Sequence, residues 1–276
     1  MPTTLTPRAE PALTPAFPDI ADVHRSAASR VGARIDHYYH AFVRRRFAGI
    51  TRALGRHIGP GSVILDVGAN HGRFTKHLAA LHGRSCHVYA FEPIPYNLSV
   101  LRLLVGRTRN VTIVPLALST DAAEHDIYIP YKRKSGRFVH GSAHLGTAGR
   151  ERHFGTRTAP DLCRATIRTV RLDDWARDQG LERLDLMKID VEGAEALVVE
   201  GGLGTIERFK PAIFAELIPG TPERVERTVD DVVRPLRALG YTMLMGDKRL
   251  GGVRAVEGCQ ADGRDYLFLP PGHAGA

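Results

Sequence analysis

Residues 63–75 read VILDVGANHGRFT, and this stretch decides the fold class. Its first five residues form a short run of branched and apolar side chains, which is typical of a buried strand and too short for a helix. Gly68 and Gly72 then permit a tight turn, and residues 74–81 have the pattern of a helix. Because a helix start exposes free N–H groups and the positive end of its dipole, this strand–turn–helix unit is suited to bind a ligand.

Strand and helix patterns alternate after this unit. We expect strands at residues 63–67, 87–92, 111–115 continuing to 119, 125–130, 166–170, 184–191, 212–217, 241–245 and 266–269, and helices at 74–81, 95–105, 172–179, 194–201 and 223–239. Strands that alternate with helices at this interval indicate an α/β fold with a parallel, doubly wound sheet and helices on both faces.

The chain divides into three parts. Residues 1–20 hold five prolines and few large apolar side chains, so we expect a disordered leader there, and one without the apolar stretch of a secretory signal. Residues 21–58 place apolar side chains three and four apart and predict a helical N-terminal extension, which Gly59-Pro60-Gly61 ends. Residues 59–276 then form one domain with a long polar loop insertion at about 131–160, a length typical of functional lids.

Composition excludes several classes of protein. A chain of 276 residues can bury a full core, and it has no apolar run approaching the roughly 18–20 residues of a membrane span. Cys86, Cys163 and Cys259 are odd in number and far apart, which excludes a disulfide framework and predicts a cytoplasmic location. The net charge is +8, but the 32 Arg and 6 Lys residues are spread along the chain, so we expect no nucleic-acid partner.

The turn after the first strand predicts a cofactor site. Glu92 ends the next strand 20 residues after Gly72, where a carboxylate can accept hydrogen bonds from both hydroxyls of a ribose. A dinucleotide fold would place the middle glycine of G-x-G-x-x-G where this chain has Asn70, which argues against NAD. S-adenosylmethionine fits better, with its carboxylate near the helix start and Asp66 near its ammonium group. A strand–turn–helix without a ligand is the alternative.

A second group of polar residues follows a central strand. Lys188, Asp190, Glu192 and Glu195 lie within eight residues, and Glu216 ends the next strand. Because ligands of open α/β sheets bind beyond the carboxyl ends of the strands, we expect Asp190 and Glu216 around one crevice. That pair could orient an acceptor hydroxyl, act as general base or hold a divalent metal, although two carboxylates alone do not make a metal site and we expect none.

A series of motifs joins these two groups. In chain order it comprises Asp66-Val67-Gly68-Ala69-Asn70 with Gly72, Phe91-Glu92-Pro93 with Pro95 and Asn97, Ala117-Leu118-Ser119, Leu172-Asp173-Asp174, Lys188-Ile189-Asp190-Val191-Glu192-Gly193 with Glu195, and Lys210-Pro211 with Glu216. The series resembles the FkbM-type S-adenosylmethionine-dependent methyltransferases. The resemblance implies a class I methyltransferase (Rossmann-like) fold with a seven-stranded, mostly parallel sheet, and O-methylation of a hydroxyl on a sugar, glycan, glycolipid or other secondary metabolite.

The resemblance also implies roles for individual residues. Those near the cofactor would be Asp66, Gly68, Ala69, Asn70, Gly72, Phe74, Thr75, Glu92, Pro93, Asn97, Ala117, Leu118 and Ser119. The catalytic candidates are Asp190 as first choice of base, Glu216 or a loop histidine as second, Glu192, and Lys188 as a balancing charge. Where family members often carry Gly-Ser-Ser-Leu, this chain has residues 141–145, GSAHL, so His144 is a candidate for the substrate side or simply an exposed loop residue.

Three other functions compete with this prediction. A nicotinamide-dependent oxidoreductase would need the glycine that Asn70 replaces. A nucleic-acid methyltransferase would need a concentrated basic face or aromatic side chains for stacking, and a non-catalytic binding module would not need the second group of carboxylates. We expect a small-molecule or glycan acceptor with a free hydroxyl, covered by the 131–158 loop and the N-terminal helix. The acceptor's identity and the oligomeric state, a homodimer included, stay open.

Overall fold

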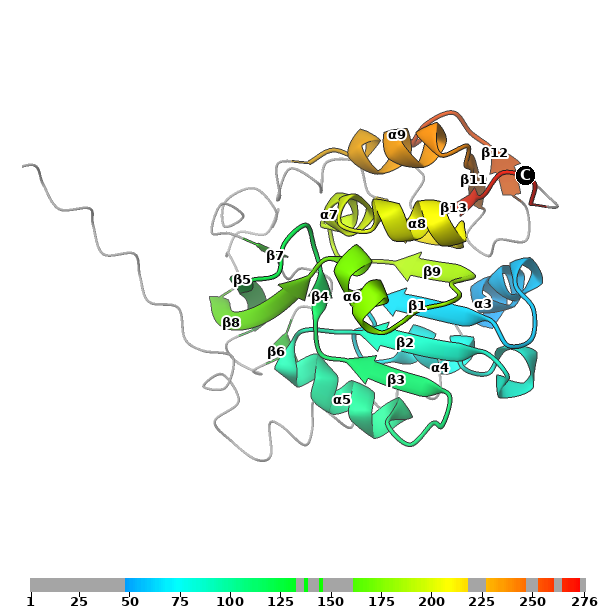
Figure 1. The fold of residues 1–276 in the computed structure, drawn as a ribbon. Coiled ribbons are helices and arrows are strands. Elements are labelled where there is room, and N and C mark those ends of the chain that lie inside the picture. The colour runs from blue at the N-terminus through cyan, green and yellow to red at the C-terminus, as the bar shows by residue number, and fades with distance from the viewer. Residues whose placement is uncertain are drawn as a thin grey trace, which may run out of the picture.

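The computed structural model describes residues 48–132, 137–138, 144–145, 161–217, 227–246, 253–260 and 265–273. A sheet of eight strands forms its centre, in the order β12-β11-β13-β10-β9-β1-β2-β3 (Figure 1). Their bounds are β1 Val63–Val67, β2 His87–Phe91, β3 Val111–Val114, β9 Leu186–Ile189, β10 Ala212–Glu216, β11 Thr242–Gly246, β12 Val253–Ala255 and β13 Asp265–Leu269. The expected class I methyltransferase fold is confirmed, with β12 as an eighth strand beyond the seven expected.

Strand direction places the functional edge. Five strands, β3, β2, β1, β9 and β10, run parallel, so their carboxyl ends meet at one edge of the sheet. β13 enters antiparallel between β10 and β11 and brings the start of a strand, Asp265, to the same edge beside Glu216. The order reverses at β1, which has β2 on one side and β9 on the other, and this switch point is where open α/β sheets bind ligands.

Helices cover both faces of the sheet (Figure 1). α6 (Leu172–Asp178), α7 (Glu195–Glu200), α8 (Leu203–Phe209) and α9 (Asp230–Ala238) share one core cluster with alternate strand residues such as Leu65 and Val67. α3 (Ala48–Leu54), the 3-10 turn η1 (Gly55–His57) and α4 (Arg73–Leu78) lie on the opposite side, where α3 and α4 pack on Ile64. Because strand side chains alternate between faces, Asp66 points to the same side as Ile64, towards α4.

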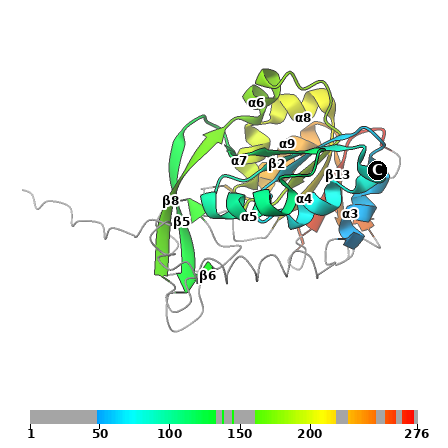
Figure 2. The same ribbon diagram turned by 90° about the horizontal axis from the view of Figure 1, so that it is seen from below.

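A second, smaller sheet corrects the expected third strand. The chain leaves the main sheet after β3, and β4 (Ala117–Leu118) pairs with β8 (Asp161–Val170) instead of continuing β3. Pro115 lies between the two strands and has no N–H to extend the first pairing. β5 (Glu124–Lys132) runs antiparallel to β8, and β6 (Arg137–Phe138) pairs with β5 (Figure 2). β7 (His144–Leu145) also pairs with β5.

The second sheet has a core of its own. β5 includes the strand expected at residues 125–130, and its Ile127 and Ile129 are buried with Cys163 and Ala165 of β8. Tyr96 of α5 (Pro95–Val105) packs against the same cluster. Whether a strand is buried depends on the residues that pack around it. For β5 these residues belong to β8 and α5, which lie about 35 positions away in sequence. The second sheet is therefore anchored to the main domain beside the turn that follows β2.

Other element boundaries differ from the expectations. α8 and β12 were not predicted, and α9 begins at Asp230 within the described residues instead of at 223. α3 and η1 agree with the predicted helical extension over its last ten residues, while residues 1–47, and with them the leader, lie outside the described part. Most of the predicted 131–160 insertion also lies outside the described residues. Only the end of β5 and the short strands β6 and β7 are described. No helix of the described residues is long and apolar enough to span a membrane.

Candidate functional site

The turn between β1 and α4 is shaped by three residues with left-handed backbone. φ is +77° at Gly68, +51° at Asn70 and +79° at Gly72. The N–H groups of Gly68 and Ala69 both donate to the carbonyl of Phe91, at 3.1 and 2.8 Å, which ties the turn to the end of β2. The turn is thus a loop of fixed shape at the switch point of the sheet.

Gly68 also brings the turn against the second group of polar residues. A Cβ at this position would lie 2.0 Å from the main-chain oxygen of Asp190. At Gly72 a Cβ would lie 2.5 Å from Cδ1 of Leu101, so this glycine lets the start of α4 pack on α5. The absence of a side chain at Gly68 therefore allows the predicted cofactor turn and the predicted base to lie side by side.

We expect Gly68→Ala to destabilise the protein by about 1–3 kcal/mol more than Gly83→Ala, because overpacking is added to backbone strain. The two glycines are matched, since φ is +67° at Gly83 but no atom lies within 4 Å of its Cβ position. Guanidinium denaturation of both variants measures the difference in free energy of unfolding. Equal losses would mean that the Asp190 backbone yields without cost.

Glu92 stands at the end of β2 and is buried, with 3% of its surface exposed. Oε2 accepts a hydrogen bond from the N–H of Asn70 at 2.8 Å, and Oε1 accepts from the N–H of Ile94 at 2.9 Å and from Nδ2 of Asn97 at 3.2 Å. Burial raises the pKa of Glu92 to about 7, against the lowering effect of these donors and of Lys188. The carboxylate thus holds the turn in place.

The contacts of Glu92 modify its expected role. A carboxylate has about four acceptor positions, and the hydrogen bonds above fill three of them. Among the described residues nothing else donates to Glu92, which leaves one position on Oε2, so Glu92 has room for one ribose hydroxyl instead of the two that were expected. The expected cofactor residue Asn97 serves here to hold Glu92.

A buried polar network lies under the turn. Asp66 is fully buried, and its Oδ2 accepts a 2.6 Å hydrogen bond from the hydroxyl of Thr75. Nζ of Lys188 lies 3.3 Å from Oδ1 of Asp66 and donates to the carbonyl of Gly68 at 2.8 Å. Asp66 was predicted to face the ammonium group of the cofactor, but its carboxylate instead faces Lys188 and Thr75. The reason is strand alternation, which turns Asp66 towards α4.

Several other predicted site residues also have packing roles. Phe74 is buried under the sheet and stacks on Phe214, with ring centroids 5.9 Å apart. Lys188 is 3% exposed, so the predicted balancing charge acts from inside the protein and does not reach the surface of the crevice. Leu118 belongs to the core cluster under α6, whereas Ala117 packs on the core of the second sheet. Pro93 is half-buried beside Glu92, and Ser119 is buried just after β4.

The predicted pair of carboxylates is present. Asp190, half-buried after β9, forms an ion pair with Lys188 at 3.5 Å, and a hydrogen bond joins its side chain to that of Glu216. Burial raises the pKa of Glu216 to about 7, and the charges of Asp190, Asp265 and Glu192 raise it further. At neutral pH the pair therefore carries a proton part of the time, and it can accept one from a substrate.

The turn after β9 is held by Glu195. Oε1 of this buried side chain accepts hydrogen bonds from the N–H groups of Val191 and Gly193, both at 3.1 Å. Between them, Glu192 has a left-handed backbone with φ of +60°. The acidic residues at 190–195 therefore have two roles. Glu195 is structural, whereas Asp190 and Glu192 are partly exposed beyond the end of β9.

Asp265 is a site residue that was not predicted. It pairs with Glu216 across β13 and β10, and its charge contributes to the raised pKa of that residue. The sequence signal that could have identified Asp265 is its position as an acidic residue at the start of the last expected strand.

His144 lies on β7 opposite Tyr128, and its side chain falls outside the described part of the chain. No three His, Cys, Asp or Glu side chains of the described residues are grouped so that they could hold a metal ion.

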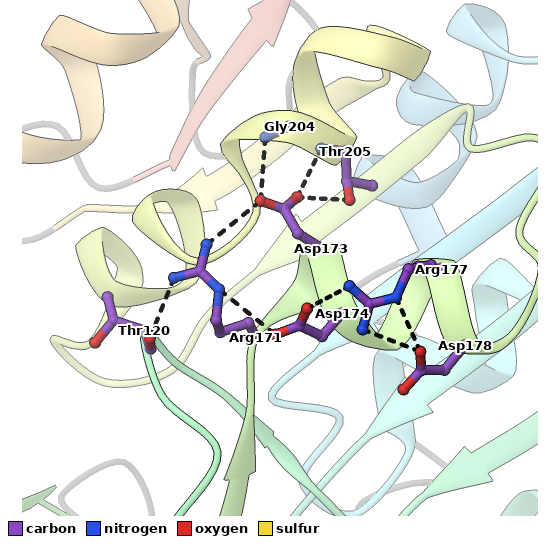
Figure 3. A network of polar contacts seen from close by, with 8 residues as sticks. All are labelled: Thr120, Arg171, Asp173, Asp174, Arg177, Asp178, Gly204 and Thr205. Atoms are coloured by element: carbon purple, nitrogen blue, oxygen red, sulfur yellow. Dashed lines mark hydrogen bonds and ion pairs between the residues drawn. The ribbon is translucent and has the colours of Figure 1, made fainter.

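Asp173 and Asp174 of the motif Leu172-Asp173-Asp174 belong to a network of polar contacts between α6, α8 and the segment after β4 (Figure 3). Asp173 accepts hydrogen bonds from the N–H groups of Gly204 and Thr205 and from the Thr205 hydroxyl, and so caps the start of α8. Arg171 donates to the carbonyl of Thr120 and pairs with Asp173 and Asp174. These contacts join the segment after β4 to α6 and α8, which makes this motif structural.

Comparison with known proteins agrees with this geometry. Residues 66–243 match the family model of the methyltransferase FkbM domain, which is more than half of the chain. The chain belongs to the FkbM methyltransferase family. The match begins at Asp66 and ends within β11, so it includes the cofactor turn, the carboxylate pair and the second sheet of this FkbM domain.

Curated relatives of the FkbM domain are distant. The 2-O-methyltransferase NoeI of Sinorhizobium fredii is 29% identical over 165 residues, which cover 55% of this chain and 61% of NoeI. The 31-O-demethyl-FK506 methyltransferase FkbM of Streptomyces tacrolimicus is 28% identical over 207 residues, covering 69% and 76%. The chain thus spans about three fifths of the length of NoeI. The solved FkbM methyltransferase of Methylobacillus flagellatus aligns at 13% identity with a TM-score of 0.47, over 90% of this chain and 60% of that one.

Proposed function

We propose that this chain is an S-adenosylmethionine-dependent O-methyltransferase acting on a hydroxyl of a sugar, glycan, glycolipid or other secondary-metabolite acceptor. One observation carries the proposal. The turn of the FkbM domain approaches the Asp190 backbone so closely that a Cβ at Gly68 would overlap it. A methyl donor held by the turn and a hydroxyl held by the carboxylates would therefore be neighbours, which is what methyl transfer requires.

The residues of the turn fit such a cofactor. Oδ1 of Asn70 is buried and has no hydrogen-bond partner among the described residues. A buried, unpaired acceptor is costly, and a donor on a ligand would satisfy it. Glu92, with its one remaining acceptor position, lies directly beside Asn70 and suits a ribose hydroxyl. Gly68, Ala69 and Asn70 would thus hold the cofactor from one side and Glu92 from the other.

The side chains of the crevice supply the rest of the reaction. When bound, S-adenosylmethionine would supply an electrophilic methyl group on a sulfonium, whose sulfur would keep the electron pair of the S–C bond. A protonated hydroxyl is a poor nucleophile, so a base must take its proton. Asp190 is placed to accept that proton at its carboxylate, beside Glu216. The half-exposed position of Asp190 gives the proton a later route to solvent.

The charge at the crevice supports a sugar-like acceptor over a polyanion. The charges of Asp190, Glu192 and Asp265 all act on Glu216 at the carboxyl edge of the sheet. Like charges in contact disfavour a bound phosphate backbone, whereas carboxylates accept hydrogen bonds from neutral hydroxyls. The acidic edge therefore favours hydroxyl-rich acceptors over nucleic acid.

The test is to incubate the protein with methyl-deuterated S-adenosylmethionine and a panel of acceptors, and to follow the label by mass spectrometry. The panel holds oligosaccharides, a glycolipid, a hydroxylated polyketide and a structured RNA. We expect the label on an oxygen of a carbohydrate or polyketide. Label on the RNA, or no label on any member although S-adenosylhomocysteine binds, would contradict the proposed acceptor class.

A further inference from the structure

Lys188 connects the two halves of the site. Its ammonium group lies 2.8 Å from the carbonyl oxygen of Gly68, 3.3 Å from Oδ1 of Asp66 and 3.5 Å from Oδ2 of Asp190. A buried ammonium is costly unless it is paired. Burial by itself lowers the pKa of Lys188, but Asp190 and Asp66 hold it above its usual value. The positive charge of Lys188 is thus held in one position under the predicted cofactor turn, where it attracts the carboxylate of Asp190.

Glu216 has the opposite surroundings. Asp190 faces it from the end of β9, Glu192 from the following turn and Asp265 from β13. Among the described residues, no Lys, Arg or His forms an ion pair with Glu216. Two hydrogen-bonded carboxylates share one proton more readily than they carry two charges. The cation Lys188 lies near Asp190, and the additional carboxylate Asp265 lies near Glu216. The proton therefore does not have the same free energy on the two carboxylates.

We propose that Lys188 and Asp265 are positioning residues that act on the Asp190–Glu216 pair from opposite sides. The ammonium group of Lys188, 3.5 Å from Asp190, favours a negative charge on that carboxylate, and the charge of Asp265, opposite Glu216 in the strand register, favours the shared proton on Glu216. The O–H of Glu216 then donates to one oxygen of Asp190, which leaves the other oxygen for the acceptor hydroxyl. This assignment of the base rests on the proposed function, but the protonation of the pair can be measured without any substrate.

Lys188 has a second consequence for the reaction. The same ammonium group binds the Gly68 carbonyl of the turn and the carboxylate of Asp190, so one side chain sets the position of both. A displacement of the turn would move the cation away from Asp190. The protonation of the base is therefore linked to the geometry of the cofactor turn.

The experiment is a pH titration of the full chain labelled with carbon-13 at the Asp and Glu carboxyl groups, followed by NMR between pH 5 and 9. Asp190→Asn and Glu216→Gln assign the two signals, and Glu92→Gln separates the other glutamate with a pKa of about 7. In the wild type we expect the Glu216 signal to titrate near pH 7. A wild-type Glu216 that has already lost its proton at pH 6 would overturn the proposal.

Two variants test the positioning residues. In Lys188→Met we expect the midpoint of the pair to rise by about one pH unit, a tenfold change in ionisation constant. In Asp265→Asn, which removes a half-buried carboxylate at the crevice, we expect the Glu216 midpoint to fall by about half a unit or more. Glu207→Gln, at an exposed site on α8, is the control and should change neither signal.

The outcomes separate this inference from the proposed function. An unchanged Glu216 midpoint in Asp265→Asn overturns the inference, and this variant decides the matter if Lys188→Met does not fold. Calorimetry with S-adenosylhomocysteine on the same samples tests the cofactor assignment. Binding of that probe with the wrong protonation pattern would refute the inference alone, whereas the expected pattern without binding would refute the proposed function alone.

Discussion

We expect Asp190→Asn to turn over the acceptor about 10²–10⁴ times more slowly than the wild type, which is the usual contribution of a general base. The amide keeps the size of the side chain but cannot take the proton of a hydroxyl. Asp66 and the Gly68 carbonyl remain as partners for Lys188, so the fold and the turn should persist. The measurement is the rate of labelled methyl transfer to the best acceptor of the panel, with S-adenosylhomocysteine affinity as the check on binding.

The matched control for this variant is Asp178→Asn. Asp178 lies on α6, pairs with Arg177 and is 65% exposed (Figure 3). It should retain wild-type turnover, because an exposed ion pair contributes little. An Asp190→Asn enzyme with the wild-type rate and pH profile would show that Asp190 is not the base.

The second large effect concerns Glu92. We expect Glu92→Ala to weaken the binding of S-adenosylhomocysteine roughly ten- to 150-fold, because a hydrogen bond to a charged group contributes about 1.5–3 kcal/mol. The variant also removes the acceptor for the Asn70 N–H, so the turn loses its support. Isothermal calorimetry measures the affinity, and Glu207→Ala on α8 is the exposed control. An affinity equal to that of the wild type would refute the cofactor assignment.

The pKa of Glu92 adds a dependence on pH. If the ribose hydroxyl binds the ionised carboxylate, a pKa of about 7 makes the ligand bind roughly tenfold more tightly at pH 8 than at pH 6. Glu92→Gln should bind the ligand weakly at both pH values, without this dependence on pH.

The free energy of unfolding should depend on pH in the opposite direction. A carboxyl group whose pKa is raised in the folded state contributes stability at low pH, and this contribution is lost as the pH rises through about 7. Without ligand, Glu92 should therefore lower the free energy of unfolding between pH 5 and 8.

The main sheet could be predicted because its strands are buried on both faces. Runs such as residues 63–67 and 212–217 are apolar except for one acidic residue each, Asp66 and Glu216, and Gly or Pro residues interrupt the chain near them. Parallel order then places the ends of β9 and β10 side by side, which brings Asp190 and Glu216 together as expected. The second sheet escaped prediction because β5 pairs with β8 across some 40 residues, and no local pattern encodes that pairing.

The roles of charged residues were the harder part. Asp66, Lys188 and Glu195 are as polar in sequence as Asp190, but the structure buries the first three and leaves Asp190 half-exposed. That difference depends on which face of a strand a residue occupies and on which helix covers that face. Asp265 became part of the site only because β13 inserts antiparallel beside β10.

By itself, the sequence of this protein determined the α/β class, the glycine turn after the first strand, and the carboxylates at the strand ends. These features depend on local rules, namely side-chain periodicity, glycine conformation and the direction of successive parallel strands. Only the tertiary structure decided which carboxylates are supports, which are paired with Lys188, and which face the crevice. Burial and neighbouring charges set those roles, and both come from segments that are distant in sequence.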